Sequence, residues 1–186
     1  MRIGILGATG AVGEQMLKVM EERGIDCELR LFASQRSLGR TASYMGRDVE
    51  LRVISDEGLR GLDYLLGAAE ADVSRALLPQ IRDSGAVYID NSSAFRLDPE
   101  VPLVIPQING GDALNHKGVV ANPNCSTIIT YMALAPIRTV YTRSSVHSRD
   151  GSGRGLPVHR APGPHAPSPT AAVRTARSSS CGAAGP

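Results

Sequence analysis

The chain has 186 residues, of which 42% are hydrophobic, and its formal net charge is +2 at pH 7. This length and hydrophobic content are sufficient for one domain with its own core. No apolar stretch reaches the roughly 18 residues of a membrane span, and the N-terminus lacks a basic segment followed by an apolar one. We therefore expect a cytoplasmic protein and no membrane partner.

Charge divides the sequence into two parts. Residues 138–186 contain seven Arg and one Asp, a charge of +6, so residues 1–137 carry −4. Arg, Ser, Pro, Gly and Ala dominate this tail, which has too little apolar surface to offset the entropy of ordering. We expect a disordered, low-complexity tail over residues 138–186. It has no aromatic residue after Tyr141 and no amphipathic period, so we expect no nucleic-acid partner.

Strand-like and helix-like segments alternate over residues 1–137. A buried strand is predicted over residues 2–6, followed by a glycine loop and a helix that ends near Arg23. Further strands are predicted over residues 27–33, 41–44, 49–54, 62–68, 86–90, 101–105 and 118–121, a turn over 45–48, and helices over 71–84 and 112–116 and from Cys125 onward. This order indicates an α/β fold with a doubly wound, mostly parallel, Rossmann-like sheet, and residues 1–137 form the expected dinucleotide-binding domain.

The first loop has the sequence GATGAVG at residues 7–13. Glycines permit a tight turn and a close approach of the backbone to a phosphate, and the N-terminus of the following helix attracts anions. The alternative is an ordinary turn between a strand and a helix. We interpret the loop as a pyrophosphate cradle formed by Gly7, Thr9, Gly10, Ala11, Val12 and Gly13.

The end of the second predicted strand bears on the choice of cofactor. An NAD enzyme usually places a carboxylate there, about 20 residues beyond the glycines, to bind the ribose 2′-hydroxyl. This chain instead has Ser34, Arg36 and Ser37, whose hydroxyls and guanidinium suit a 2′-phosphate. We therefore expect NADP(H) rather than NAD(H), with a solvated loop and an incidental arginine as the alternative.

Two further segments follow predicted strands, where ligands gather in an open α/β sheet. In DNSSAFR, residues 90–96, Arg96 can fork onto a phosphate or a carboxylate, with a surface salt bridge as the alternative. In NPNCSTI, residues 122–128, Cys125 begins a helix, whose unpaired N–H groups and macrodipole favour a thiolate. We interpret Cys125 as a nucleophile, although free cysteines are often simply buried, and Asn124 as an N-cap or a site-lining residue.

The three cysteines, Cys27, Cys125 and Cys181, are an odd number without the spacing of metal ligands. We expect reduced thiols, with no disulfide framework and no metal site. Cys27, inside a predicted strand, is expected in the core, and Cys181 lies in the tail. His116, the only histidine of residues 1–137, is expected to be a polar residue near a helix end.

Taken together, these residues resemble aspartate-semialdehyde dehydrogenase. The resemblance covers residues 1 to about 137. Its motifs are, in order, GATGAVG at residues 7–13, SQRSLG at 34–39, DNSSAFR at 90–96, VPLVIPQIN at 101–109 and ANPNCSTI at 121–128. The resemblance implies reversible conversion of aspartate β-semialdehyde, phosphate and NADP+ to aspartyl phosphate and NADPH, for the biosynthesis of lysine, threonine, methionine and isoleucine.

The resemblance also implies roles for single residues. Cys125 would form a thiohemiacetal and then a thioester, which phosphate cleaves. Arg96 would bind phosphate or the acyl phosphate, and Asn124 with the N–H of Cys125 would stabilise the oxyanion. The glycine loop would hold the pyrophosphate of NADP(H), and Ser34, Arg36 and Ser37 its 2′-phosphate.

The sequence departs from the family in two places. Family members usually have a glutamate where this chain has Gln107. They also continue into a second domain for substrate binding and homo-oligomerisation, with a catalytic histidine and a substrate-binding arginine, and no such pattern follows Ile137. We therefore expect an inactive fragment, and we hypothesise a change of reading frame after residue 137.

Two alternatives are kept. The chain could be a non-catalytic NADP-binding module, or an inhibitory partner that docks on a full-length homologue. N-acetyl-γ-glutamyl-phosphate reductase shares the architecture but usually has Pro-Gly-Cys-Tyr at the nucleophile, where this chain has Pro-Asn-Cys-Ser at residues 123–126. A short-chain reductase would need a tyrosine four residues before a lysine, and no tyrosine in this chain has one.

Overall fold

The computed structural model describes residues 1–140 of the chain, except for the side chains of residues 138–140. Cys181 and the predicted disordered tail lie outside the described residues, apart from residues 138–140, whose backbone continues the last helix. In the part of the chain that the structure describes, no helix has both the length and the apolar character needed to cross a membrane.

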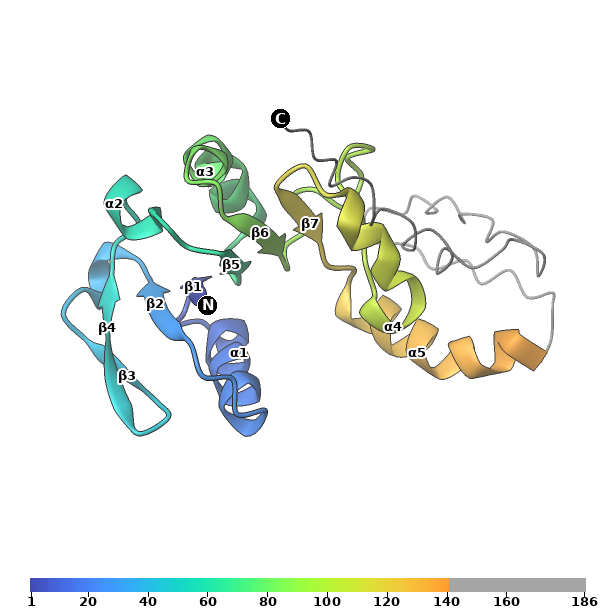
Figure 1. The fold of residues 1–186 in the computed structure, drawn as a ribbon, viewed down its shortest axis with the longest axis horizontal. Helices are drawn as coiled ribbons and strands as arrows, with labels where there is room; N and C mark the ends of the chain where they lie inside the picture. Colours follow the sequence, from blue (N-terminus) through green and yellow to red (C-terminus); the bar gives the residue numbers. More distant parts are fainter. Residues whose placement is uncertain (141–186) are drawn as a thin grey trace, which may run out of the picture. The chain divides into compact units, whose positions relative to one another are not determined.

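The strands of residues 1–140 form one sheet in the order β3-β4-β2-β1-β5-β6-β7 (Figure 1). Neighbouring strands are parallel, except that β3 is antiparallel to β4. The predicted doubly wound, mostly parallel α/β sheet is confirmed. The strand bounds are β1 (Arg2–Leu6), β2 (Glu28–Phe32), β3 (Thr41–Tyr44), β4 (Arg47–Arg52), β5 (Tyr64–Gly67), β6 (Val87–Asp90) and β7 (Val119–Ala121).

Helices connect the strands, and α1 and α3 lie on opposite faces of the sheet (Figure 1). α1 ends where the sequence predicts, because Gly24 behind it adopts φ +61°, a conformation that favours glycine. The helix predicted over residues 112–116 is instead a 3₁₀ turn that follows a short α-helix. The bounds are α1 (Ala11–Glu22), α2 (Asp56–Leu59), α3 (Ala71–Asp83), α4 (Pro106–Asn109) and α5 (Cys125–Val140), with 3₁₀ turns η1 (Gln35–Ser37) and η2 (Gly110–Asn115).

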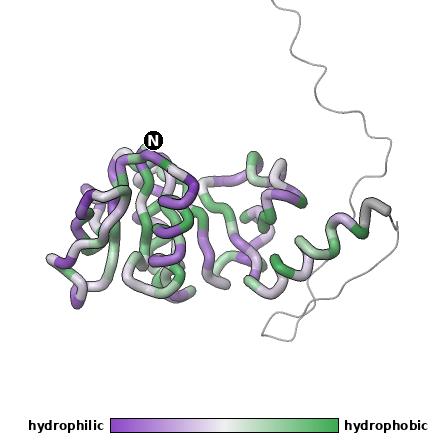
Figure 2. Tube along the Cα trace, turned by 90° about the horizontal axis from the view of Figure 1, so that it is seen from below, coloured by the Kyte–Doolittle hydropathy of each residue, from purple (hydrophilic) through white to green (hydrophobic). Residues whose placement is uncertain are grey.

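The core has two layers, one on each face of the sheet, because successive side chains of a strand point to opposite faces. Figure 2 shows the hydrophobic residues concentrated along the central strands. The cluster on the α1 face contains Ile3, Ile5, Leu17, Met20 and Leu31. The cluster on the α3 face contains Leu6, Phe32, Leu65, Ile81, Tyr88 and Phe95.

The hairpin of β3 and β4 turns more tightly than the sequence predicts. Met45 and Gly46 have φ of 51° and 71°, so both central residues are left-handed, as in the two-residue turns that match the twist of paired strands. β4 therefore begins at Arg47 and ends at Arg52, two residues earlier than the predicted strand over residues 49–54. The predicted four-residue turn is wrong.

The predicted strand over residues 101–105 is not formed. Leu103 makes only an isolated bridge to β7. Pro102 has no N–H to donate to a strand ladder, and the side-chain amide of Asn109 takes the place of a strand partner. Its Oδ1 accepts the Ile105 N–H at 2.8 Å, and its Nδ2 donates to the Leu103 carbonyl at 2.9 Å.

The two-layered core predicts different effects for two leucine substitutions. Leu65 is fully buried, whereas Leu114 is 87% exposed. Leu65→Ala should lower the free energy of unfolding by about 2–5 kcal/mol, because the deleted methyl groups leave a cavity. Leu114→Ala, the matched control, should change it by less than about 0.5 kcal/mol. Urea denaturation followed by circular dichroism measures both, and equal effects would contradict the described core.

Candidate functional site

The loop between β1 and α1 is shaped by two glycines. Gly7 has φ +82°, and a Cβ there would lie 2.7 Å from the Ala68 carbonyl oxygen. A Cβ on Gly13 would lie 2.4 Å from the Gly7 carbonyl oxygen. The N–H groups of Gly7 and Ala8 donate to the Phe32 carbonyl at 2.9 and 3.1 Å, which ties the loop to the end of β2. Only glycine fits at positions 7 and 13 without a shift of the backbone.

The first turn of α1 is open to a ligand. Its N-cap residue, Gly10, has no side chain with which to cap the helix. The Gly10 carbonyl accepts the Glu14 N–H at 2.9 Å, so the helix ladder begins there. The N–H groups of Ala11, Val12 and Gly13 precede the first intrahelical donor. Together with the positive end of the helix dipole, they provide a site suited to an anion.

A cleft of about 850 Å³ opens at the carboxyl ends of β1, β2, β5 and β6. Strands β2, β3 and β4 lie on one side of β1, and β5, β6 and β7 lie on its other side. The cleft lies at the point where the strand order reverses. Ligands bind at this position in doubly wound sheets. The predicted residues that line it are Gly7, Thr9, Gly10, Val12 and Ser34. The other lining residues include Val53, Ile54, Val73, Ala76, Leu77, Asn91, Ser92 and Ser93.

The remaining predicted cofactor residues lie beside the cleft rather than in its lining. Ala11 is exposed, and Gly13 is buried under the loop. After Ser34 the turn η1 leaves Arg36 exposed and Ser37 buried. The Ser37 N–H donates to the Ser34 carbonyl at 2.9 Å. Arg36 has no hydrogen bond or ion pair with any described residue, so its guanidinium is available to an anion.

Arg96 joins the ends of β6 and β7. Its Nε donates to the Asn122 carbonyl at 2.9 Å, and its Nη2 donates to the Asn91 carbonyl at 2.9 Å. The side-chain amide of Asn122 also donates to that of Asn91. A guanidinium has five N–H groups, so three of them remain for an anion. Arg96 therefore ties a wall of the cleft to the segment that precedes Cys125.

Cys125 is the first residue of α5, and it is exposed. Asn124 caps this helix, since its Oδ1 accepts the Ser126 N–H at 3.0 Å and also accepts the Ser126 hydroxyl. The Cys125 sulfur lies 3.9 Å from the same oxygen. Asn124 thus takes the N-cap role that the sequence offers as one interpretation. Its Nδ2 group has no hydrogen-bond partner among the described residues, and the oxyanion role stays a prediction.

A buried polar cluster next to the cleft is not predicted by the sequence analysis. Ser74, Tyr88 and Asp90 have no exposed surface. Asp90 Oδ1 accepts the hydroxyls of Ser74 and Tyr88, each at 3.1 Å, and its Oδ2 accepts the Ser92 hydroxyl at 2.6 Å. Ser92 Oγ in turn accepts the Ala94 N–H at 3.0 Å. Only the spacing of Tyr88 and Asp90, two residues apart on one strand, signals a shared face.

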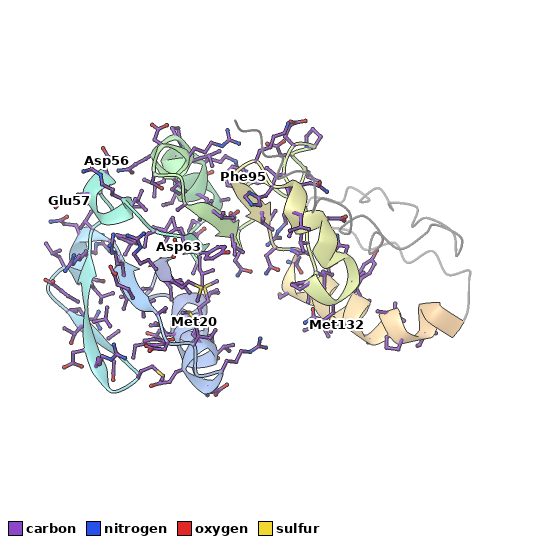
Figure 3. The ribbon with its side chains drawn as sticks, viewed as in Figure 1. Met20, Asp56, Glu57, Asp63, Phe95 and Met132 are labelled. Carbon is purple, nitrogen blue, oxygen red and sulfur yellow. The ribbon has the colours of Figure 1, made fainter. Side chains whose placement is uncertain are left out.

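The phenol of Tyr88 stays protonated in this cluster. The Ser74 and Tyr88 hydroxyls also lie 2.9 Å apart, within hydrogen-bond distance. Burial, the largest cause, raises the pKa of Tyr88 well above its ordinary value; the hydrogen bond with Ser74 lowers it, and the Asp90 charge raises it further. The ring packs edge-on against Phe95, labelled in Figure 3, with centroids 6.3 Å apart and planes at 78°. Gly67 makes room for the phenol, because a Cβ there would lie 2.4 Å from the Tyr88 oxygen.

His116 behaves as the sequence predicts, and Cys27 does so only in part. Cys27 precedes β2 rather than lying inside a strand, and it is half-buried against the core cluster on the α1 face; burial raises the pKa of its thiol. His116 follows the last residue of η2, and its Nδ1 accepts the Gly118 N–H at 3.0 Å. Both residues are accounted for by local structure.

The family model described as "Semialdehyde dehydrogenase, NAD binding domain" matches residues 2–116. The chain belongs to the semialdehyde dehydrogenase family. It is 43% identical to the aspartate-semialdehyde dehydrogenase of Prochlorococcus marinus over 138 residues, which are 74% of this chain and 40% of the relative. With the enzyme of Bacillus subtilis the identity is 43% over 147 residues, 78% of this chain and 42% of the relative. The chain thus spans about two fifths of the length of these curated relatives.

A solved structure supports the same relationship. The crystal structure of aspartate semialdehyde dehydrogenase II from Vibrio cholerae complexed with ASA has a TM-score of 0.70 and 39% identity to this chain. The match covers 74% of this chain and 46% of that one. The resemblance to aspartate-semialdehyde dehydrogenase and the Rossmann-like fold are confirmed, and the family is one of oxidoreductases.

The buried phenol predicts a loss of stability at alkaline pH. A tyrosine in the unfolded chain ionises near pH ~10, whereas folded Tyr88 keeps its proton to higher pH because its pKa is raised. Above the unfolded pKa the unfolded state binds fewer protons than the folded state, so the free energy of unfolding falls as pH rises. Tyr88→Phe should make this slope shallower by up to about 1.4 kcal/mol per pH unit above pH ~10 in urea denaturation. Equal slopes in both proteins would contradict the burial of the phenol.

Proposed function

We propose that this chain is the cofactor-binding and nucleophile-bearing part of an NADP-dependent aspartate-semialdehyde dehydrogenase. The reaction converts L-aspartate 4-semialdehyde, phosphate and NADP+ to L-4-aspartyl phosphate, NADPH and a proton. One observation carries the proposal. The cleft with the glycine loop and the helix that begins at Cys125 both follow the carboxyl ends of strands of the same sheet. Arg96 connects them, because it bonds to Asn91 of the cleft and to Asn122 of the cysteine segment.

The cleft fits the phosphates of a dinucleotide. Gly7 and Gly13 leave a cradle that a Cβ would fill, and the first turn of α1 has no side-chain cap. We assign the pyrophosphate to this loop. Ser34 lines the cleft and Arg36 is exposed beside it, so we assign the 2′-phosphate to them, with buried Ser37 supporting the turn. The absence of a carboxylate over residues 33–40 favours NADP(H) over NAD(H).

The chemistry assigned to Cys125 is covalent. Its thiolate adds to the aldehyde carbon, forming a C–S bond, and the carbonyl oxygen takes up the negative charge. The amide of Asn124 and the first-turn N–H groups of α5 are the donors available to that oxyanion. NADP+, held at the glycine loop, would supply the acceptor for the hydride of this carbon, and a thioester on Cys125 would result. Phosphate then attacks the thioester carbon and the thiolate leaves, while Arg96 holds the phosphate through its unused N–H groups.

The wider setting is part of the same proposal. The complex of the Vibrio cholerae relative with ASA supports the substrate class. We place the reaction in the cytoplasm, in the biosynthesis of lysine, threonine and methionine. α5 exposes Ile129, Met132 and Ile137 by 70%, 39% and 49%, and Met132 is labelled in Figure 3. Such apolar surface fits a contact with another domain or subunit, in keeping with a homo-oligomeric enzyme.

Arg36 should decide between the two nicotinamide cofactors. Arg36→Ala should weaken NADP+ binding about 10- to 100-fold, since a hydrogen bond to a charged group contributes about 1.5–3 kcal/mol. NAD+ binding should be unchanged. Arg82→Ala, which removes an exposed arginine in the last turn of α3, is the matched control. Isothermal titration of the wild type and both variants with each cofactor measures the six constants, and preferential binding of NAD+ by the wild type would refute the cofactor assignment.

We expect negligible NADPH formation by the 186-residue chain from aspartate semialdehyde and phosphate. The only histidine among the described residues, His116, accepts the Gly118 N–H and stands at the end of η2, so it is not assigned as a base. Absorbance of NADPH is followed for the wild type, Cys125→Ser and, as control, Cys27→Ser. A robust rate that is lost only in Cys125→Ser would overturn this expectation while supporting the nucleophile.

Binding of NADP+ without turnover also fits a second interpretation. A non-catalytic module or an inhibitory partner of a full-length homologue would give the same result in the assay. The two are separated by mixing the chain with an active homologue at increasing ratios. A fall in the homologue's activity, with mixed oligomers in size-exclusion chromatography, favours the inhibitory partner.

A further inference from the structure

Asp90 is a buried carboxylate without a cationic partner. It has no exposed surface, and among residues 1–140 the ion pairs of Lys and Arg go to other carboxylates. Removing a carboxylate from water is costly unless hydrogen bonds replace the lost hydration. Here three hydroxyls supply them, from Ser74, Tyr88 and Ser92. These bonds fix the positions of three side chains around Asp90.

The three hydroxyls come from three different elements next to the cleft. Ser74 lies in the first turn of α3, whose residues Ala71 and Val73 line the cleft. Tyr88 lies in β6 and stands over Gly67 at the end of β5. Ser92 lies in the segment 91–93, which lines the cleft directly. A single carboxylate therefore connects the start of α3, strand β6 and the segment 91–93.

The segment 91–93 is held at several of its polar groups. Ser92 donates its O–H to Asp90 and accepts the Ala94 N–H, which fixes the direction of the next peptides. The Asn91 N–H donates to the Gly67 carbonyl at 3.1 Å, and the Asn91 carbonyl accepts from Arg96. The segment thus has one orientation before a ligand arrives, and such preorganisation lowers the entropy cost of binding.

We propose that Asp90 is a positioning residue for the NADP(H) site, acting through Ser92 on the segment 91–93 and through Ser74 on the start of α3. This inference rests on the proposed function, because the ligand of the cleft is the one proposed there. Asp90 itself, being fully buried, does not touch the ligand. Its contribution is the fixed geometry of the segment 91–93, which lines the same cleft as the glycine loop.

Ser92 gives the sharpest variant, because the chain contains a matched control. Ser84 also accepts the N–H of the residue two positions later, Ala86, at 3.3 Å, and donates to the Ile81 carbonyl at 2.7 Å. It lies at the far end of α3 and outside the cleft. Ser92→Ala and Ser84→Ala should therefore lower the melting temperature by similar amounts. Only Ser92→Ala should weaken NADP+ binding, by about 5- to 10-fold.

The variant Asp90→Asn tests whether the hydrogen bonds of residue 90 or its negative charge matter for binding. The asparagine oxygen can accept the hydroxyls of Ser74 and Tyr88, and its NH₂ group can donate to Ser92, which has a second lone pair free. NADP+ affinity should therefore stay within about threefold of the wild type. In Asp90→Ala these contacts are lost, and affinity should fall at least as far as in Ser92→Ala. Amide hydrogen exchange over residues 91–96 should rise in Ser92→Ala and Asp90→Ala and stay low in Asp90→Asn.

The outcomes distinguish the two proposals in isothermal titrations of the full chain with NADP+. If the wild type does not bind NADP+, the proposed function fails, and the positioning role fails with it. If the wild type binds and Ser92→Ala binds equally well, only the positioning role is overturned. Loss of affinity in Asp90→Asn as large as in Ser92→Ala would also overturn it, because the charge rather than the geometry would then matter.

Discussion

The candidate site depends on one side chain that holds two strand ends together. Arg96 donates to the carbonyls of Asn91 and Asn122, which follow β6 and β7. Asn91 lines the cleft, and Asn122 leads through Pro123 to the cysteine helix. The tie adds to the Asn122–Asn91 side-chain hydrogen bond and to the bond of the Asn122 N–H with the Asp90 carbonyl, so the cofactor wall and the nucleophile segment are joined at several points. An arginine suits the position because its fork can serve two carbonyls and still leave donors for an anion.

On the other side of the cleft, the packing of the glycine loop requires that residues 7 and 13 have no Cβ. Gly7 and Gly13 bring the loop, α1 and the end of β5 closer than any side chain would permit. This leaves the first turn of α1 facing the same space as the wall that Asp90 and Ser92 hold. The proposed cofactor would thus be bound between a glycine loop that is free of side chains and a wall fixed by buried hydrogen bonds.

Most of the fold is predictable from the sequence, because apolar runs of strand length alternate with helical spacing and glycine stops. The exceptions have physical causes. Pro102 lacks the N–H that would extend the ladder, so the segment makes only two backbone hydrogen bonds with Ala121, and the amide of Asn109 bonds Leu103 and Ile105. The Met45–Gly46 turn needs only two left-handed residues. The secondary-structure preferences of single residues do not show that a distant side chain, such as that of Asn109, will bond to the backbone of a segment. They also do not show how many residues a turn will contain.

The site is predictable where a motif is contiguous, as in the glycine loop and the segment around Cys125. The cluster of Ser74, Tyr88 and Asp90 joins residues up to 16 positions apart, so no local pattern contains it. Ser37 shows the reverse case, since its hydroxyl suggests a ligand contact but the turn η1 buries the residue.

The most direct test of the whole account is amide hydrogen exchange of the full chain with and without NADP+, measured by mass spectrometry. Exchange should slow on binding in two separate segments, residues 7–13 and 91–96, because both line the cleft that holds the ligand. Protection confined to one of these segments, or found only elsewhere, would show that the cofactor does not bind in this cleft.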